Sequence, residues 1–278
     1  MSAVQAAMSS RSLLFVLVLV TASGCMSGYA APAPITPLLG GRGDVVAGAT
    51  FRPAFPRREA SAYLAAAPTE STRVYVAGTH TLARGESGVD IPNRELKERN
   101  HTDEVEGGGG WGIARGRLRA EILGGLGYGR VQSTQGARTL DRDPDFVSTW
   151  VQARGHFARA SVQAQAAAHV AHWTGGGGVR IALVRFQYAE VLGYEGPVTA
   201  LVPTFEPFMV QRLELPFGSI QLTIHAPIVP YSPSISLSDA INADRRVSTR
   251  LIETPIPRIF LSFQANLDEL WRKRPARP

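Results

Sequence analysis

The alternation of apolar and polar residues is the dominant pattern along this chain. Between residues 117 and 131 most apolar residues share one parity, and most charged residues share the other with most of the glycines. This period of two is typical of a β-strand with one apolar face. The pattern recurs and predicts ten strands, over residues 43–54, 59–67, 72–82, 103–114, 117–132, 150–172, 178–190, 203–214, 217–228 and 256–267.

A glycine-rich stretch lies inside one of these predicted strands. Gly107, Gly109 and Gly112 have the GxGxxG spacing of a dinucleotide-binding loop. In that motif the glycines lie between the end of a strand and the start of a helix. Here the alternation continues through the glycines, and another strand follows. We therefore predict a strand in which glycine permits curvature or close backbone approach.

Two strands leave details open. The region 150–172 is long enough for a single strand or for a hairpin bent near Arg159, and we favour the single strand because it keeps the strand count even. In the region 178–190 the apolar parity changes between Leu183 and Val184, which predicts a β-bulge.

The links between the predicted strands alternate in length. Short links at 68–71, 115–116, 173–177 and 215–216 alternate with long ones at 84–101, 133–150, 191–202 and 229–255. Short periplasmic turns and long extracellular loops are typical of transmembrane barrels. We therefore predict an all-β fold, a single antiparallel up-and-down transmembrane barrel over residues 43–267, with both chain ends in the periplasm. A soluble sandwich or lipocalin-like barrel is the alternative, since parity alone does not say which face meets lipid.

The N-terminal region has the order of a secretory signal. The apolar run 13–20 is shorter than the roughly 20 residues of a membrane-spanning helix, and small residues follow it. The ending ASGC resembles the lipobox of bacterial lipoproteins, although Ala22 stands where that pattern prefers Leu. The resemblance implies cleavage before Cys25 and its acylation. We expect a signal peptide at 1–24, an acylated cysteine and flexible tether at 25–42, and a basic tail at 268–278.

The net charge of the chain and its distribution bear on which partners the protein could bind. The chain has 29 Lys and Arg against 23 Asp and Glu, a net charge of +6. The surplus is spread along the sequence, so we do not predict nucleic-acid binding.

A charged set on the polar parity of two neighbouring predicted strands is the main candidate site. It comprises Glu104, Glu106, Arg117, Arg119 and Glu121. Opposite charges on adjacent strands pair when their side chains share a face. We predict a salt-bridge network inside the barrel that fills the lumen, in preference to a selective pore.

Other polar residues give weaker signals, and we predict no catalytic residue, metal or cofactor. His169 and His172 are three apart, so on a strand they face opposite sides, and His225 is predicted to line the lumen. His101 and Asp103 lie near a predicted rim, where their proximity alone suggests a His–Asp hydrolase. The acidic run Asp141, Asp143 and Asp145 begins like an EF-hand loop, but Phe146 stands where that loop requires glycine.

The chain has a family likeness, which is carried by the segments TPLL, GDVVAGA, AYLAAAPTESTRVYVAG, EGGGGWG, RAEILGGLGYGRVQS, VRIALVRFQYAEV, FEPFMVQR and RIFLSFQANL. It resembles small outer-membrane β-barrel (lipo)proteins of unassigned function from Bacteroidetes and related Gram-negative bacteria. The resemblance implies contact with outer-membrane lipid and with the lipoprotein-processing and barrel-assembly machinery. We predict a non-enzymatic structural or surface-interaction role, with recognition by the extracellular loops. The alternatives are an outer-membrane hydrolase or acyltransferase using His101, Asp103 or His156, and a soluble lipid-tethered barrel that binds a small apolar ligand.

Overall fold

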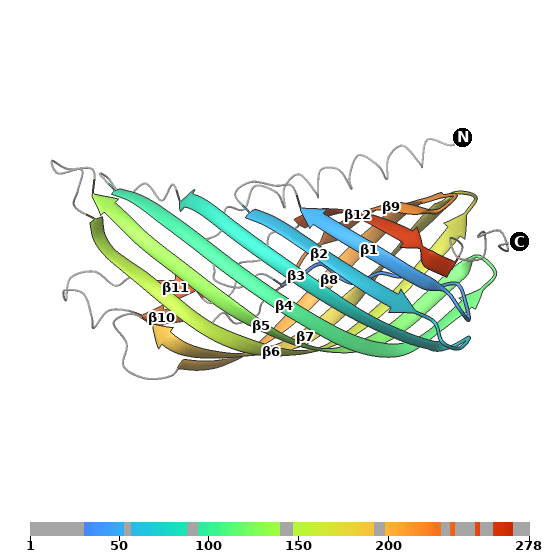
Figure 1. Ribbon diagram of the computed structural model, residues 1–278, viewed down its shortest axis with the longest axis horizontal. Coiled ribbons are helices and arrows are strands. Elements are labelled where there is room, and N and C mark those ends of the chain that lie inside the picture. Colours follow the sequence, from blue (N-terminus) through green and yellow to red (C-terminus); the bar gives the residue numbers. More distant parts are fainter. Residues whose placement is uncertain are drawn as a thin grey trace, which may run out of the picture.

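The computed structural model describes residues 31–52, 57–87, 94–139, 147–191, 198–228, 234–236, 248–250 and 258–268. Ten strands form the wall of the molecule (Figure 1). They are β1 (Val45–Arg52), β2 (Arg57–Ala66), β3 (Thr72–Ser87), β4 (Arg94–Arg115), β5 (Leu118–Thr139), β6 (Val147–Val170), β7 (Trp173–Val191), β8 (Val198–Leu215), β9 (Gly218–His225) and β12 (Arg258–Asn266). Neighbours along the chain pair antiparallel, and β1 pairs with β12 to close the barrel. The predicted ten-stranded fold is confirmed.

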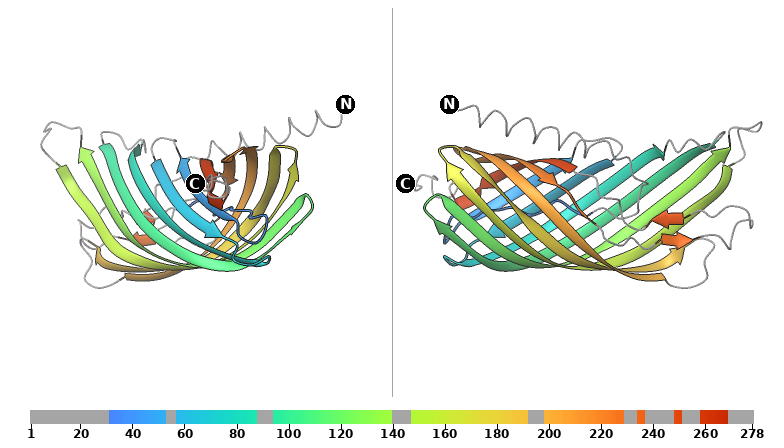
Figure 2. Two further views of the ribbon diagram at one scale, coloured as in Figure 1. Left: turned by 45° about the vertical axis from the view of Figure 1, so that its right-hand side comes forward. Right: turned by 180° about the vertical axis from the view of Figure 1, so that it is seen from behind.

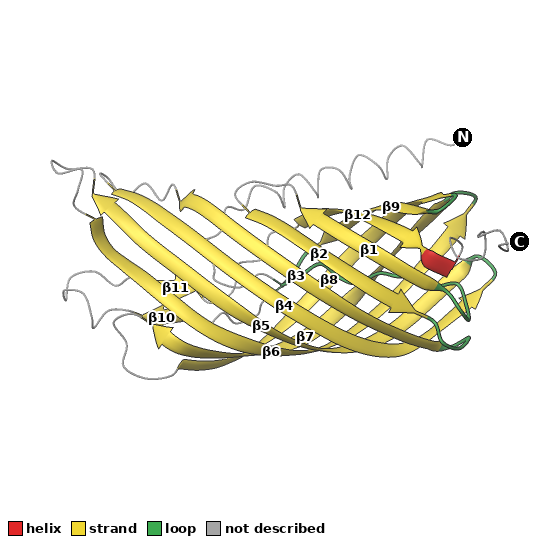
Figure 3. Cartoon of the chain, viewed as in Figure 1, coloured by secondary structure: helices red, strands yellow, loops and turns green. Residues whose placement is uncertain are grey.

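The two ends of the barrel differ. The links at 67–71, 116–117, 171–172 and 216–217 gather at one end, where Figure 3 draws them in green, and we call it the turn end. Gly116 has φ 58° there, a left-handed conformation that suits glycine in a tight turn. We call the opposite end the loop end. The short strands β1, β2, β9 and β12 form one side of the barrel and the long strands β4 to β7 form the other, so the loop-end rim is oblique.

Strand at the loop end extends further than the sequence predicted. Much of the predicted loops 84–101 and 133–150 belongs to β3, β4, β5 and β6. The predicted loop 229–255 holds a further two-stranded sheet of β10 (Ser234–Ser236) and β11 (Ser248–Arg250). The sequence missed these extensions because alternation weakens where both faces of a strand are polar.

The two open details are settled. The region 150–172 is one strand, β6, as predicted. The predicted bulge between Leu183 and Val184 is wrong, because burial alternates without a break through this part of β7. The parity of the apolar residues changes because Val184 and Phe186 are buried inside the barrel. The shift of register between β6 and β7 falls instead between Arg154 and Gly155.

The distribution of apolar side chains is inverted relative to a soluble protein. Large apolar residues point outward and are exposed, for example Leu126 at 72% and Leu118 at 64%, whereas Arg73, Arg159 and Arg180 are fully buried inside. In water-soluble proteins long charged side chains are almost never fully buried unless paired. An apolar exterior around a polar interior is the arrangement of transmembrane barrels. No helix in the described part of the chain is long and apolar enough to cross a membrane.

The lumen of the barrel contains part of its own chain. The sequence predicted a flexible tether over 25–42, but residues 31–39 are all buried inside the ring of strands. Figure 2 shows this ring of strands from two further sides. Ile35 and Leu39 pack against inward-facing Val46 and Tyr63. The described part of the predicted tether is therefore a packed element, which we call the luminal segment (residues 31–40).

Candidate functional site

The luminal segment is extended and rich in proline, and it exposes carbonyl groups to the barrel wall. Pro32, Pro34 and Pro37 have no N–H to donate, so the segment offers more acceptors than donors. A buried carbonyl without a partner is costly. Arginine and glutamine side chains on the inner wall supply the donors along the segment, from the turn end to the loop end.

At the turn end the segment is held by a buried carboxylate. The backbone N–H groups of Leu38 and Leu39 donate to Glu121 at 3.3 and 2.8 Å. The Arg119 guanidinium donates to the Leu38 carbonyl at 2.8 Å, and Arg73 donates to the Leu39 carbonyl at 3.4 Å. Donors and acceptors of the backbone are both satisfied here by side chains of β3 and β5.

In the middle of the lumen the contacts come from the opposite wall. Arg212 of β8 donates to the carbonyls of Thr36 and Pro37, the latter at 3.1 Å. Gln221 of β9 donates to the Thr36 hydroxyl at 2.5 Å. On the other side, Gln163 of β6 donates to the Ile35 carbonyl at 2.6 Å. The segment therefore bridges strands on both sides of the barrel.

Toward the loop end the segment reaches the level of the rim on the short-strand side. Arg180 donates to the carbonyls of Pro32 and Ala33. The Ala33 N–H donates to Glu59 of β2 at 3.0 Å, and Arg258 donates to the Ala31 carbonyl at 2.6 Å. Arg258 is the first residue of β12. The luminal segment thus runs from the turn end to the loop end of β12.

Four of the five predicted luminal residues face inward, and their partners differ from those expected. Glu104 and Glu106 both pair with Arg159 of β6, at 2.7 Å for Glu104. Tyr75 and Ser161 donate to Glu106 at 2.8 and 2.9 Å. A single arginine therefore bridges two carboxylates that follow each other on the inner face of β4.

Glu121 pairs with Arg73 at 3.4 Å. Arg119 serves the Leu38 carbonyl, as described above. Arg117 is not part of the luminal network, because it lies in the turn 116–117 with an exposed side chain. The hairpin uses this residue to reverse the chain, so β5 begins one residue later than predicted.

The lumen contains a second group of charged residues, of which only His225 was predicted from the sequence. Glu206 of β8 pairs with Arg180 of β7, and His225 of β9 contacts it through Nε2 at 3.2 Å. His225 is fully buried, so its predicted position in the lumen is confirmed. Arg180 and Glu206 could not be predicted as partners from the sequence, because the alternation does not reveal which residues lie opposite each other.

Glycines on the inner wall make room for this network. A Cβ at Gly125 would lie 2.1 Å from the Tyr75 hydroxyl oxygen and 2.3 Å from a Glu106 oxygen. A Cβ at Gly108 would lie 2.2 Å from the Gly124 carbonyl oxygen and 2.7 Å from the Tyr75 ring. The predicted role of the glycine-rich stretch, close approach within a strand, is confirmed for β4 and β5.

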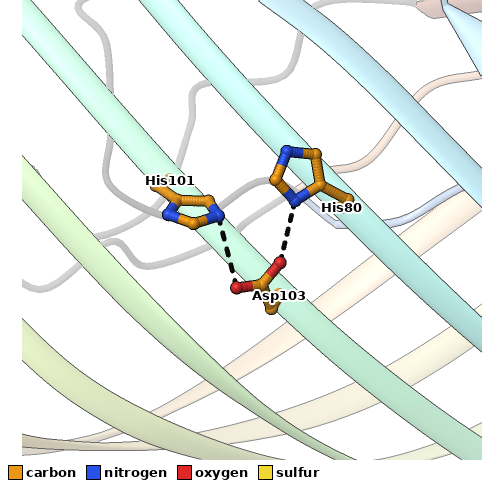
Figure 4. Close-up of side chains that lie close together, drawn as sticks. All are labelled: His80, His101 and Asp103. Atoms are coloured by element: carbon orange, nitrogen blue, oxygen red, sulfur yellow. Dashed lines mark hydrogen bonds and ion pairs between the residues drawn. The ribbon is translucent and has the colours of Figure 1, made fainter.

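A different cluster lies on the outer wall. Asp103 of β4 contacts two histidines at once: His80 Nδ1 at 2.8 Å from one carboxylate oxygen, and His101 Nε2 at 3.2 Å from the other (Figure 4). Pairing of β3 with β4 places His80 opposite Asp103. The three side chains are 40–56% exposed and face away from the lumen. The sequence singled out His101 and Asp103 and missed His80, which only the strand register brings to them.

A groove on the outer wall adjoins this cluster. It has a volume of about 850 Å³ and is lined by small residues of β1, β2 and β3, among them Ala49, Ala62 and Gly78. Larger side chains, including Phe51 and Phe263, border it, and His80 and Asp103 lie at its polar end. The groove exists because neighbouring strands all carry small residues at the same outward level.

The outward cluster belongs to a row of basic residues. In the described part of the wall, outward basic and histidine side chains at this level are Arg58, His80, His101, Arg130, Arg154, His156 and Arg185. Asp103 is the one acidic side chain among the described outward positions of the ten barrel strands. His156 stacks on Tyr128 with ring centroids 5.7 Å apart, so it does not join the cluster.

The remaining candidates lie elsewhere. His169 shares a hydrogen bond with Thr174 at 2.9 Å, and His172 is exposed in a turn. Cys25 and the acidic run at 141–145 lie outside the described residues.

Fold and site together define a closed antiparallel barrel with a polar, chain-filled lumen. Comparison with family models found no match, and neither did comparison with curated proteins. Among solved structures the barrel is similar to the translocator domain of the autotransporter NalP from Neisseria meningitidis. The identity is 14%, the match covers 94% of each chain, and the TM-score is 0.40.

Proposed function

We propose that this chain is an outer-membrane barrel closed by its own N-terminal segment, with a structural or surface-interaction role. The observation that carries the proposal is the luminal segment itself, which is buried over residues 31–39 and hydrogen-bonded to both sides of the wall. A lumen filled in this way does not offer an open pathway for solutes. Recognition of a partner would then take place on the surface at the loop end.

The outer surface supports insertion into a bilayer. On β5 the apolar outward stretch from Leu118 to Tyr128 has about the 9–11 residues that a tilted strand needs to span the hydrocarbon core. Exposed Trp111, Trp173 and Phe217 lie toward the turn end, and the basic row lies on the loop-end side. Aromatic and charged residues commonly flank the apolar band of such barrels.

The path of the luminal segment bears on where the chain ends lie. Short turns of transmembrane barrels face the periplasm, so we place the turn end there. The described C-terminal residues lie at that end, where the Asn266 N–H donates to the Phe217 carbonyl. Ala31, by contrast, lies beside Arg258 at the loop end. Six residues of extended chain reach at most about 20 Å, so we propose that Cys25, if acylated, sits on the outer side and not in the periplasm as predicted.

Conductance in planar bilayers tests the closed lumen. We expect the chain from Cys25 onward to be silent, and a chain that starts at Gly41 to open in discrete steps. Unboiled samples on SDS–PAGE, where a folded barrel migrates differently, establish that both proteins are folded. Equal conductance of the two folded proteins would contradict the proposal.

A cross-link provides a second test that does not require truncation. Thr36→Cys and Gln221→Cys place thiols at side chains whose polar atoms are 2.5 Å apart. In a Cys25→Ala background we expect a short bifunctional thiol reagent to join them in outer-membrane fractions. The matched control pairs Thr36→Cys with Leu222→Cys, which faces outward on the same strand. Cross-linking that is equal in both pairs would show that the segment is not fixed in the lumen.

Epitope accessibility tests the placement of the N-terminal end. An epitope inserted after Met26 should bind antibody on intact cells, whereas one at the C-terminus should require permeabilised cells. Access to the N-terminal epitope only after permeabilisation would restore the periplasmic arrangement. Loss of the Cys25→Ala protein from carbonate-washed membranes would support the soluble tethered barrel instead.

A further inference from the structure

The geometry of the outward cluster points to a metal site. We propose that His80, His101 and Asp103 bind one divalent transition-metal ion, with Zn²⁺ as the representative, on the outer wall of the barrel. This inference does not depend on the closed lumen, since the cluster lies on the opposite face of β3 and β4.

The positions of the ligand atoms carry the proposal. One nitrogen of each imidazole and one carboxylate oxygen lie within 4.8 Å of one another. Figure 4 shows both rings turning a nitrogen toward the Asp103 carboxylate. Zinc sits 2.0–2.1 Å from imidazole nitrogen and 2.0–2.2 Å from carboxylate oxygen. Because the three side chains are half-exposed, small rotations bring their donor atoms to those distances.

The strands hold the ligands in register. His80 and Asp103 are direct partners between β3 and β4, and His101 precedes Asp103 by two residues on the same face. Hydrogen bonds of the β3–β4 ladder fix the three Cα positions before any metal arrives. Sites built on strands or helices are more precise than sites built on loops.

The donor set selects the class of ion. Two imidazoles and one carboxylate suit Zn²⁺, Cu²⁺, Ni²⁺ or Fe²⁺, whereas Ca²⁺ and Mg²⁺ prefer oxygen ligands alone. Three protein ligands leave coordination positions open. These positions face outward at the level of the basic row, where water or the phosphate of a lipid headgroup can complete the coordination.

One neighbour should weaken the site. Arg130 of β5 is the direct strand partner of Asp103, so a cationic residue occupies the outward position next to the carboxylate that would hold the ion. A second cation near a metal ion is unfavourable by Coulomb's law. Arg130→Gln should therefore tighten metal binding, a result that a merely structural His–Asp pair does not predict.

Calorimetric titration of the folded full chain with ZnCl₂, in a non-ionic detergent, tests the proposal. We expect one equivalent to bind the wild type. His80→Ala, His101→Ala and Asp103→Asn should each weaken it at least about tenfold, since even outer partners of metal ligands cost 10–100-fold when lost. The matched control is His156→Ala, which removes an outward histidine of the same row and should change nothing. Mobility of unboiled samples on SDS–PAGE verifies that each variant is folded.

X-ray absorption of the zinc-loaded wild type tests the ligand set directly and does not require any variant to fold. Two nitrogens and a carboxylate oxygen in the first coordination shell are expected. Binding should fade on acidification, because imidazole binds metal only when it is deprotonated. Equal zinc affinity in the wild type and in a folded variant lacking all three ligands would overturn the proposal, as would a shell with fewer than two imidazoles.

Discussion

Charged residues occur on both faces of this barrel, and the two faces use them differently. Inside, Arg159 and Arg180 are fully buried, and each is matched to carboxylates or carbonyls. Outside, Asp103 and its two histidines are half-exposed, and their contacts can be remade around another group. Desolvation explains the difference, because a buried charge must be paired continuously whereas an exposed one is stabilised by its surroundings. Inner charges therefore support the structure, and outer ones are available for binding.

The largest expected effect comes from removing one member of a buried pair. Arg180→Met leaves Glu206 without its main partner and also removes donors to the luminal segment, so we expect a loss of about 3–5 kcal/mol in unfolding free energy. Denaturant titration in lipid vesicles, followed by tryptophan fluorescence, measures it. The matched control is Arg185→Met on the same strand, which changes an exposed outward arginine. Similar losses of unfolding free energy in both variants would show that inner and outer arginines contribute equally to stability, against the comparison above.

A charge placed in the apolar band should have the next largest effect. Ile122 is 53% exposed on the outer wall of β5, near the middle of the band. Ile122→Arg should cost about 2–4 kcal/mol if that wall faces the bilayer interior. Leu118→Arg, at the turn end of the same strand, should cost only about 0–1 kcal/mol. In a soluble barrel both substitutions of exposed residues would stay within about 0.5 kcal/mol, so equal small effects would contradict membrane insertion.

Filling space on the inner wall should have an intermediate effect. Gly108→Ala drives a methyl group into the Gly124 carbonyl and the Tyr75 ring, so backbone must shift. Overpacking of this kind costs about 1–3 kcal/mol. Gly78→Ala is the control, since its Cβ would meet nothing nearer than 4.0 Å. The same vesicle titration compares them, and a loss for Gly108→Ala no larger than that for Gly78→Ala would mean that the inner wall is not tightly packed.

The smallest effect should come from the outer cluster in the absence of metal. With a chelator present, His80→Ala removes only an exposed contact and should change stability by about 0.2–1 kcal/mol. Zn²⁺ added in excess of the chelator should then stabilise the wild type by an amount that rises with the logarithm of the free Zn²⁺ concentration above the Kd, and leave the variant unchanged, because a ligand of the native state alone raises stability. A large loss in chelator would show that the cluster supports the fold.

Much of the wall could be predicted from the sequence, and the two kinds of error have physical causes. Alternation located all ten barrel strands, since each must present one apolar and one polar face. It misplaced strand ends at the loop end, where residues such as those at 94–101 are polar on both faces. The change of parity at Val184 and Phe186 was also wrongly interpreted as a bulge, because these apolar residues face the lumen and so interrupt the pattern of outward apolar residues.

The sequence by itself determined which side chains share a face of each strand, because side-chain direction alternates strictly along a strand. Which of the two faces lines the lumen follows from the closed barrel. Only the tertiary structure decided what those side chains touch. Strand register brings His80 to Asp103 and Arg159 to Glu106, and register depends on how the closed sheet staggers its strands. The luminal position of residues 31–39 has the same origin. A proline-rich segment carries no pattern of its own, and it becomes ordered only because the closed barrel surrounds it with donors for its carbonyls.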